Sequence, residues 1–362
     1  MEEARRLIDS RTIQGFMLGS AVGDALGLPR EGLSARRAAR MFGAGPLQHR
    51  FAVGRGMMSD DTEHLCMVVQ ALLASGGEPD AFARSLAWRL RGWLVGLPAG
   101  TGWATLRAGL RLWVGYSWKT SGVFSAGNGP AMRAGILGLY AGEDDERLRR
   151  LVHRSTRITH TDPLAEEGAL LVALAARYAA RHGGDALEPA VFLADARVAV
   201  TDDRWREVLD LVAVALERNS TPDKFAESAG LIGGVSGFIV HTVAASLFCW
   251  LRYAGDFRAG VEGVIRLGGD TDSTAAITGG LLGAALGAEA IPAEWCDRLC
   301  EWPRSVNWMM RLAERLSDAT SANVADAAPL PLFWPGLIVR NLCFGVIVLL
   351  HALRRMFPPY AT

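Results

Sequence analysis

Two short acidic stretches near opposite ends of the chain carry the residue types best suited to chemistry. Residues 59–62 read Ser-Asp-Asp-Thr, and residues 268–274 read Gly-Gly-Asp-Thr-Asp-Ser-Thr. Each stretch is followed by an apolar segment of helical length, so each is expected to begin a helix. The positive end of the helix dipole and the free backbone N–H groups there favour carboxylates.

Helix capping and metal binding both account for such a stretch. A cap needs only one short polar side chain, whereas each stretch offers three or more side-chain oxygens. Oxygen-rich clusters are the ligands that hard cations such as Mg²⁺ prefer. Capping stays open as an alternative at either stretch alone, but the matched pair favours a metal site.

These motifs resemble the two metal signatures of the ADP-ribosylglycohydrolases, enzymes that remove ADP-ribose from modified proteins or related acceptors. The resemblance runs in the family's order through residues 12–315. It includes Gly-Asp-Ala-Leu-Gly at 23–27, Gly-Asn-Gly-Pro-Ala-Met-Arg at 127–133, and Thr-His at 159–160. Five motifs in order make the resemblance specific.

The resemblance implies the roles of particular residues. It implies two bound Mg²⁺ ions, with Mn²⁺ as an alternative, and it places Glu31 on a mobile flap over them. Asp24 is expected to be a supporting carboxylate at a helix junction. The implied metal ligands are Ser59, Asp60, Asp61, Asp270, Asp272 and Ser273. The implied catalytic residues are Glu31, Asp60, Asp61 and Asp270. The implied substrate-binding residues are Ser125, Gly127, Asn128, Gly129 and His160.

The same residues have plainer interpretations when they are taken without the resemblance. Glu31 is then a solvated loop carboxylate, and His160 is a histidine at a helix junction. Residues 125–129 form a glycine-rich turn before a helix, and their backbone N–H groups are suited to holding a pyrophosphate.

The implied activity is Mg²⁺-dependent hydrolysis of the N- or O-glycosidic bond between ADP-ribose and an acceptor. Both acidic motifs resemble most closely those of the family's arginine-specific members, which implies protein arginine as that acceptor. One alternative is a non-catalytic ADP-ribose-binding protein that blocks a toxin or target. Another is a metal-dependent hydrolase of a different nucleotide, such as O-acetyl-ADP-ribose. The complete carboxylate set favours the hydrolase of ADP-ribosyl groups.

Composition limits the class of protein and its partners. The 38 basic and 38 acidic residues balance, which gives no indication of nucleic-acid binding. The five cysteines show no Cys-x-x-Cys motif and are expected to be reduced. The first residues lack the apolar core of a signal peptide, so a cytoplasmic monomer is expected, with membrane association left open. The expected substrate is an ADP-ribosylated protein or a small molecule containing ADP-ribose.

Apolar residues recur with helical spacing throughout the chain, and the predicted fold is all-α, a compact orthogonal helical bundle. Glycines recur every four residues at positions 15, 19, 23 and 27, and again at 279, 283 and 287. Glycine inside a helix costs about 1 kcal/mol relative to alanine. We therefore predict that the two glycine ridges pack against each other. The tryptophans at 88, 93, 103, 113 and 118 are predicted to be mainly core residues.

The C-terminal part differs from the rest. The predicted catalytic domain spans 1–316, a low-complexity linker spans 317–331, and 332–362 forms an apolar C-terminal helix. Residues 332–353 are long enough to span a bilayer, but Arg340, Asn341 and His351 count against spanning. Docking on the catalytic domain is the favoured interpretation, and contact with a membrane or partner is the alternative.

Overall fold

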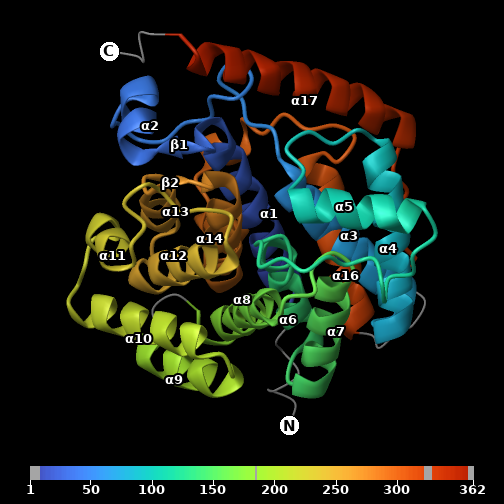
Figure 1. Cartoon of the computed structure of the whole chain (residues 1–362), viewed down its shortest axis with the longest axis horizontal. Helices are drawn as coiled ribbons and strands as arrows, with labels where there is room; N and C mark the ends of the chain where they lie inside the picture. The colour runs from blue at the N-terminus through green and yellow to red at the C-terminus, as the bar shows by residue number, and fades with distance from the viewer. Residues whose placement is uncertain (1–8, 184–185, 322–327, 358–362) are drawn as a thin grey trace.

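The computed structural model describes residues 9–183, 186–321 and 328–357 (Figure 1). These residues form seventeen α-helices and one pair of two-residue strands, which confirms the predicted all-α fold. The helices are α1 (Ser10–Gly27), α2 (Ala35–Phe42), α3 (Asp60–Ser75), α4 (Pro79–Val95), α5 (Trp103–Trp113), α6 (Gly135–Ala141), α7 (Asp145–Arg157), α8 (Pro163–His182), α9 (Pro189–Ala199), α10 (Asp203–Glu217), α11 (Pro222–Ser228), α12 (Ile239–Arg252), α13 (Phe257–Ile265), α14 (Thr271–Leu286), α15 (Ala293–Cys296), α16 (Val306–Ser321) and α17 (Trp334–Arg355). The strands are β1 (Leu33–Ser34) and β2 (Gly268–Gly269).

Helices α1 and α14 form the centre of the bundle and pack backbone against backbone (Figure 1). A Cβ atom built on Gly15 would lie 2.1 Å from the carbonyl oxygen of Gly283, and one on Gly19 would lie 2.1 Å from that of Gly279. The predicted contact between the glycine ridges is confirmed at these two levels. Gly287, which ends α14 with φ +86°, adjoins the same contact, because a Cβ on Gly15 would also lie 3.0 Å from its carbonyl carbon.

The two helices are antiparallel, and their contact continues toward the chemical motifs. The next levels pair Gly23 with Ala275 and Gly27 with Thr271. The C-terminal end of α1 therefore lies beside the N-terminal end of α14. This close packing brings Asp24 of α1 to the second acidic stretch.

The strand pair fixes the loop that enters the second acidic stretch. Strand β1 pairs antiparallel with β2, so Leu33 lies opposite Gly269. On the other side of β2, the Val235 N–H donates to the Gly268 carbonyl (2.9 Å), and the Asp270 N–H donates to the Val235 carbonyl (2.6 Å). Gly269 has φ +82°, and a Cβ there would lie 1.9 Å from the Val235 oxygen, so only glycine fits.

Three of the five clustered tryptophans are not in the core. Trp88, Trp103 and Trp113 expose 70%, 72% and 54% of their surface, whereas Trp93 and Trp118 are buried. The prediction of a mainly buried set was wrong, because these three indoles lie on sides of α4 and α5 that do not face the core.

Helix α17 lies across one side of the bundle, drawn in red at the top of Figure 1. The predicted linker 317–331 overlaps the end of α16, and its residues 322–327 lie outside the described residues. At its end the Leu330 N–H donates to Gln70 Oε1 (2.9 Å). Phe344 of α17 is buried and packs 5.0 Å from the ring centroid of Phe51.

Four polar side chains of α17 hold it on the bundle. Arg340 pairs with Glu301 (2.5 Å) and lies 3.6 Å from Glu63, and all three side chains are buried. Asn341 Nδ2 donates to the Gly96 carbonyl (2.7 Å), and His351 Nε2 is hydrogen-bonded to the Phe51 carbonyl (2.9 Å). Arg355 donates to the carbonyls of Glu31 (2.9 Å) and Pro29 (3.0 Å). The residues that counted against membrane spanning therefore bind the rest of the bundle, chiefly at its loops and helix ends.

Replacing Arg340 with leucine is expected to lower the free energy of unfolding by about 3–5 kcal/mol, because it leaves the buried Glu301 without its cation. Urea unfolding followed by circular dichroism measures the loss. The double variant Arg340→Leu/Glu301→Gln should recover part of it, and Arg36→Leu on the exposed side of α2 should change little. A loss of less than about 1 kcal/mol in Arg340→Leu would contradict the prediction.

Candidate active site

Asp24, on the last turns of α1, binds the N-terminal end of α3. Its carboxylate accepts hydrogen bonds from the backbone N–H of Ser59 (2.9 Å), the N–H of Thr62 (3.2 Å) and the Thr62 hydroxyl (2.6 Å). The residue is fully buried. Asp24 therefore positions the first acidic stretch, as expected for a carboxylate at a helix junction.

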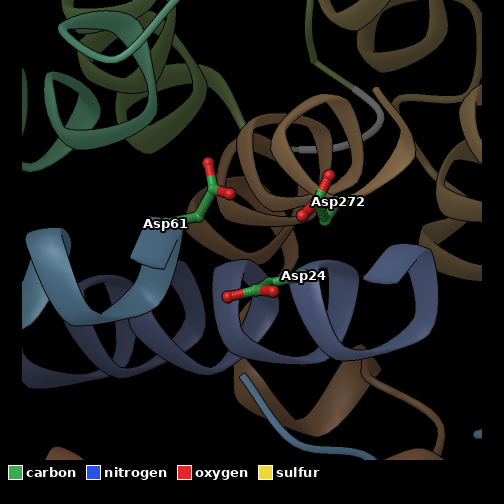
Figure 2. A group of neighbouring side chains, drawn as sticks. All are labelled: Asp24, Asp61 and Asp272. Carbon is green, nitrogen blue, oxygen red and sulfur yellow. The ribbon is translucent and has the colours of Figure 1, made fainter. Parts of the chain in front are cut away.

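Three buried carboxylates converge where α1, α3 and α14 meet. One oxygen each of Asp24, Asp61 and Asp272 lies within 4.8 Å of the others, and Figure 2 shows the three side chains gathered between these helix ends. Oδ2 of Asp61 accepts from the hydroxyls of Ser59 (3.0 Å) and Ser273 (3.2 Å). Oδ1 of Asp61 and Oδ1 of Asp272 are buried without a hydrogen-bond partner.

This cluster fits a hard divalent cation. Buried carboxylate oxygens without partners are costly unless a cation or proton compensates them. The donor set consists of oxygen atoms only, which suits Mg²⁺ or Mn²⁺ better than a softer metal. Asp24, Asp61 and Asp272 would hold such an ion directly.

Without a cation, burial and mutual repulsion raise the pKa values of the clustered carboxyls. Burial raises the pKa of Asp24 to about 6. Burial, followed by the charges of neighbouring carboxylates, raises the pKa values of Asp60, Asp61 and Asp272 well above the ordinary range. Ionising these carboxyls without a compensating cation is therefore unfavourable in the folded protein.

Magnesium is expected to raise the melting temperature of the metal-free chain more at about pH 8 than at about pH 5. In the folded protein the pKa of Asp24 is raised to about 6 and that of Glu31 to about 7. The stability that these two groups contribute is therefore fully present at pH values below their pKa values in the unfolded chain, and it is lost as the pH rises through 6 and 7. A bound cation favours the ionised carboxylates and offsets this loss. Scanning fluorimetry of EDTA-treated protein with and without magnesium measures the difference.

Buried histidines make stability rise with pH, but this does not alter the comparison of the protein with and without magnesium. Burial lowers the pKa values of His49, His64 and His160, so stability rises with pH until the unfolded histidines are neutral. This rise is common to both samples. A magnesium effect of equal size at both pH values would contradict the assignment of the carboxylates to a cation site.

Asp270 precedes α14 but does not cap it. Its side chain makes no capping hydrogen bond, and its Oδ2 instead accepts from Asn128 Nδ2 (2.6 Å). Asn128 also donates to the Thr242 hydroxyl (3.0 Å), which orients its amide. At the first stretch the cap is Ser59, whose hydroxyl accepts from the Asp61 N–H, while Asp60 lines the cavity. Capping therefore does not account for Asp60 or Asp270.

A cavity of about 280 Å³ opens over the carboxylate cluster. It is lined by most of the residues predicted from the sequence, drawn from five separate segments. Ser59 is the one predicted residue outside this lining, because it lies beneath Asp61. The predicted residues in the lining are Glu31, Asp60, Asp61, Ser125, Gly127, Asn128, Gly129, His160, Asp270, Asp272 and Ser273.

The glycine-rich loop at 125–129 uses part of its backbone internally. The Gly127 N–H donates to the Ser125 hydroxyl (3.3 Å), and the Asn128 N–H donates to the Gly237 carbonyl (3.0 Å). The sequence suggested that backbone N–H groups of this loop hold a pyrophosphate. The N–H groups of Gly127 and Asn128 are not free to do so, because both are used inside the protein. The loop contributes a surface without side chains at Gly127 and Gly129.

His160 lies behind this loop as a neutral ring. Burial and the Arg133 charge lower its pKa to about 3. The Thr159 hydroxyl accepts from Arg133 (2.7 Å) and lies 2.9 Å from His160 Nδ1, so the simplest arrangement has it donate to Nδ1. Nε2–H then faces the loop, where a Cβ on Gly127 would lie 3.1 Å away. His160 is thus suited to donating a hydrogen bond, not to exchanging protons.

Glu31 borders the cavity from the loop after α1. Much of the residue is exposed, yet its carboxyl lies beside the acidic cluster, where loss of water and the Asp270 charge raise its pKa to about 7. Its main chain is held by Arg355, and the Gly32 N–H donates to the Gly269 carbonyl (2.7 Å). The loop expected to be a mobile flap is therefore held on two sides here.

Two residues of the site were not predicted as ligands. Asp24 was placed outside the metal ligands, although the Gly-Asp-Ala motif around it belongs to the resemblance. Trp103 lines the cavity with its indole 72% exposed, and the sequence offered only its aromatic type.

A family model described as ADP-ribosylglycohydrolase matches residues 5–325. The chain belongs to the ADP-ribosylglycohydrolase family. The chain is thus an enzyme of a glycosidase-type class of hydrolases that act on ADP-ribosyl groups, and α17 lies beyond the matched residues.

Individual relatives support the assignment to the ADP-ribosylglycohydrolase family. The ADP-ribosyl-[dinitrogen reductase] glycohydrolase of Rhodospirillum rubrum is 28% identical over 79% of this chain and 89% of its own length. The human ADP-ribosylhydrolase ARH3 is 28% identical over 50% of this chain and 55% of its own. A solved structure, titled ADP-ribosylglycohydrolase-related protein complex, superposes with a TM-score of 0.65 at 28% identity and covers 88% of this chain and all of that one.

Proposed function

We propose that this family member is a Mg²⁺-dependent hydrolase that releases ADP-ribose from protein arginine. The observation that carries the metal requirement is the pair of buried, unpaired oxygens on Asp61 and Asp272 beside Asp24, at the floor of the cavity. The spelling of the acidic motifs supports arginine as the acceptor, and one similar protein is named for an ADP-ribosylated dinitrogen reductase.

The chemistry follows from where charge develops. Cleavage of the bond at C1″ of the distal ribose builds positive charge on that sugar, which the carboxylates around the cavity would stabilise. Two cations held by Asp24, Asp60, Asp61, Asp270, Asp272 and the hydroxyls of Ser59 and Ser273 would supply a water of lowered pKa and bind the ribose hydroxyls. Asn128 would orient Asp270 through its amide, and the neutral His160 would donate to the ligand.

Glu31 is proposed as the group that accepts a proton from the attacking water. Its raised pKa and its place at the cavity edge suit a general base. Replacement with glutamine should lower kcat about a hundredfold with little change in the affinity for ADP-ribose. Steady-state kinetics together with calorimetric binding of ADP-ribose separates these quantities. Weaker ADP-ribose binding at unchanged kcat would instead move Glu31 to substrate binding.

The decisive experiment offers the enzyme two substrates. Peptides carrying ADP-ribosyl-arginine or ADP-ribosyl-serine are incubated with the full chain, with and without EDTA, and free ADP-ribose is measured. Release from the arginine peptide alone, abolished by EDTA and restored by magnesium, is the expected result. Release from the serine peptide alone would overturn the acceptor, and release that persists in EDTA would overturn the metal requirement.

A further inference from the structure

The side of α17 that faces away from the catalytic helices is apolar. Five large side chains on it expose more than half of their surface, and their spacing of three and four residues places them along one side of the helix. These residues are Val339 (57%), Leu342 (56%), Val346 (57%), Leu349 (64%) and Leu353 (52%). Arg340, Asn341 and His351 point inward, and Arg354 at the end of the helix is exposed. This polarity is the reverse of that of an ordinary surface helix and leaves a large apolar surface to be covered.

Helix α17 is long and apolar enough to cross a membrane, and it is the only one of the described helices for which this holds. Its inner contacts oppose crossing. Withdrawal from the bundle would separate Arg340 from Glu301 and would leave Phe51 and Phe344 unpacked. Breaking a buried ion pair is strongly unfavourable. The helix therefore stays on the protein with its apolar side outward.

Two chain segments beside this apolar side carry positive charge only, although the exposed Glu31 directly precedes the first of them. Residues 32–59 and 328–357 contain no aspartate or glutamate. The two segments touch, because Phe51 packs on Phe344 and Arg37 donates to the Arg355 carbonyl (2.6 Å). Segment 32–59 contributes four exposed arginines and a fully exposed valine at the tip of a turn. These residues are Arg36, Arg40, Arg50, Arg55 and Val53.

From this combination we infer that the outer side of α17, with the arginines of segment 32–59, binds the surface of an anionic lipid membrane. The helix lies parallel to the bilayer, with its leucines and valines at the level of the acyl chains and the arginines at the headgroups. A second copy of the chain is the other occupant to consider. Helix pairs usually carry charged residues beside the apolar seam, whereas here the neighbouring positions include Leu350 (58% exposed) and Cys343.

Co-sedimentation with vesicles tests this inference without depending on hydrolysis. The full chain is mixed with vesicles of phosphatidylcholine alone, or of equal parts phosphatidylcholine and phosphatidylglycerol. Sedimentation with the anionic vesicles only, weakening as salt is added, is the expected result. The variant Arg36→Gln/Arg40→Gln should bind more weakly, and Val346→Glu/Leu353→Glu should lose binding. Both variants should keep the wild-type melting temperature and activity on a soluble substrate, because the altered side chains are exposed and lie outside the cavity.

A matched control is Val198→Glu on α9, at the other end of the molecule (Figure 1). Val198 is 88% exposed, so its replacement should leave vesicle binding unchanged. Failure of the wild-type chain to sediment with either vesicle would overturn the inference. Binding that resists high salt and is equal for both vesicles would overturn it in favour of a membrane span. Dimers in sedimentation velocity that Val346→Glu/Leu353→Glu converts to monomers, without vesicle binding, would overturn it in favour of a second copy.

Discussion

Replacing Asp272 with asparagine is expected to lower kcat/KM for release of ADP-ribose by about a thousandfold, which corresponds to about 4 kcal/mol of transition-state stabilisation. Asp272 is buried, and its Oδ1 has no hydrogen-bond partner in the protein. Asparagine keeps the shape but removes the charge and one oxygen available to a cation. The substitution should also abolish the rise in melting temperature on addition of magnesium. Steady-state kinetics and scanning fluorimetry measure the two effects.

The same loss of charge should not destabilise the metal-free protein. The pKa of Asp272 is raised by burial and by neighbouring carboxylates, so removing its ionisable group relieves repulsion. Asp256 is a suitable control, because it caps α13 by accepting from the Ala259 N–H (2.9 Å). Asp256→Asn should keep its activity and its response to magnesium. Near wild-type activity of Asp272→Asn at limiting magnesium would show that the cation assignment is wrong.

Replacing Gly19 with alanine is expected to lower the free energy of unfolding by more than about 4 kcal/mol. The new Cβ would lie 2.1 Å from the Gly279 carbonyl oxygen, so α1 and α14 would have to move apart along their whole contact. The matched substitution Gly279→Ala should act similarly, since its Cβ would lie 2.3 Å from the Gly19 carbonyl oxygen. Urea unfolding of soluble protein, or failure to obtain folded protein, records the effect.

Gly345 provides the opposite control within a helix. A Cβ there meets nothing within 4 Å, so Gly345→Ala should stabilise the protein by about 0.5–1 kcal/mol through helix propensity. Equal stability of Gly19→Ala and the wild-type chain would contradict the structural role of the glycine ridge. The separation of α1 from α14 should also displace Asp24 from Asp272, so any folded Gly19→Ala should respond weakly to magnesium.

The sequence alone determined the helical elements and the identity of most candidate residues. Both acidic stretches were predicted to begin helices, and α3 (Asp60–Ser75) and α14 (Thr271–Leu286) begin there, because an apolar segment of helical length is a local property of the chain. The four-residue glycine spacing likewise predicted the contact of α1 with α14, since only a close backbone approach offsets the cost of glycine. The paired acidic motifs identified Asp61 and Asp272 before their proximity was known.

Only the tertiary structure decided how these residues act together. The hydrogen bonds of Asp24 to α3 join segments 35 residues apart, and the distance between Asp61 and Asp272 joins segments about two hundred residues apart. Both depend on tertiary packing, which no local pattern encodes. The direction of α17 was decided in the same way. Its composition allows docking, spanning or surface binding, and only the buried partners of Arg340 and Asn341 place its polar side inward and its apolar side out.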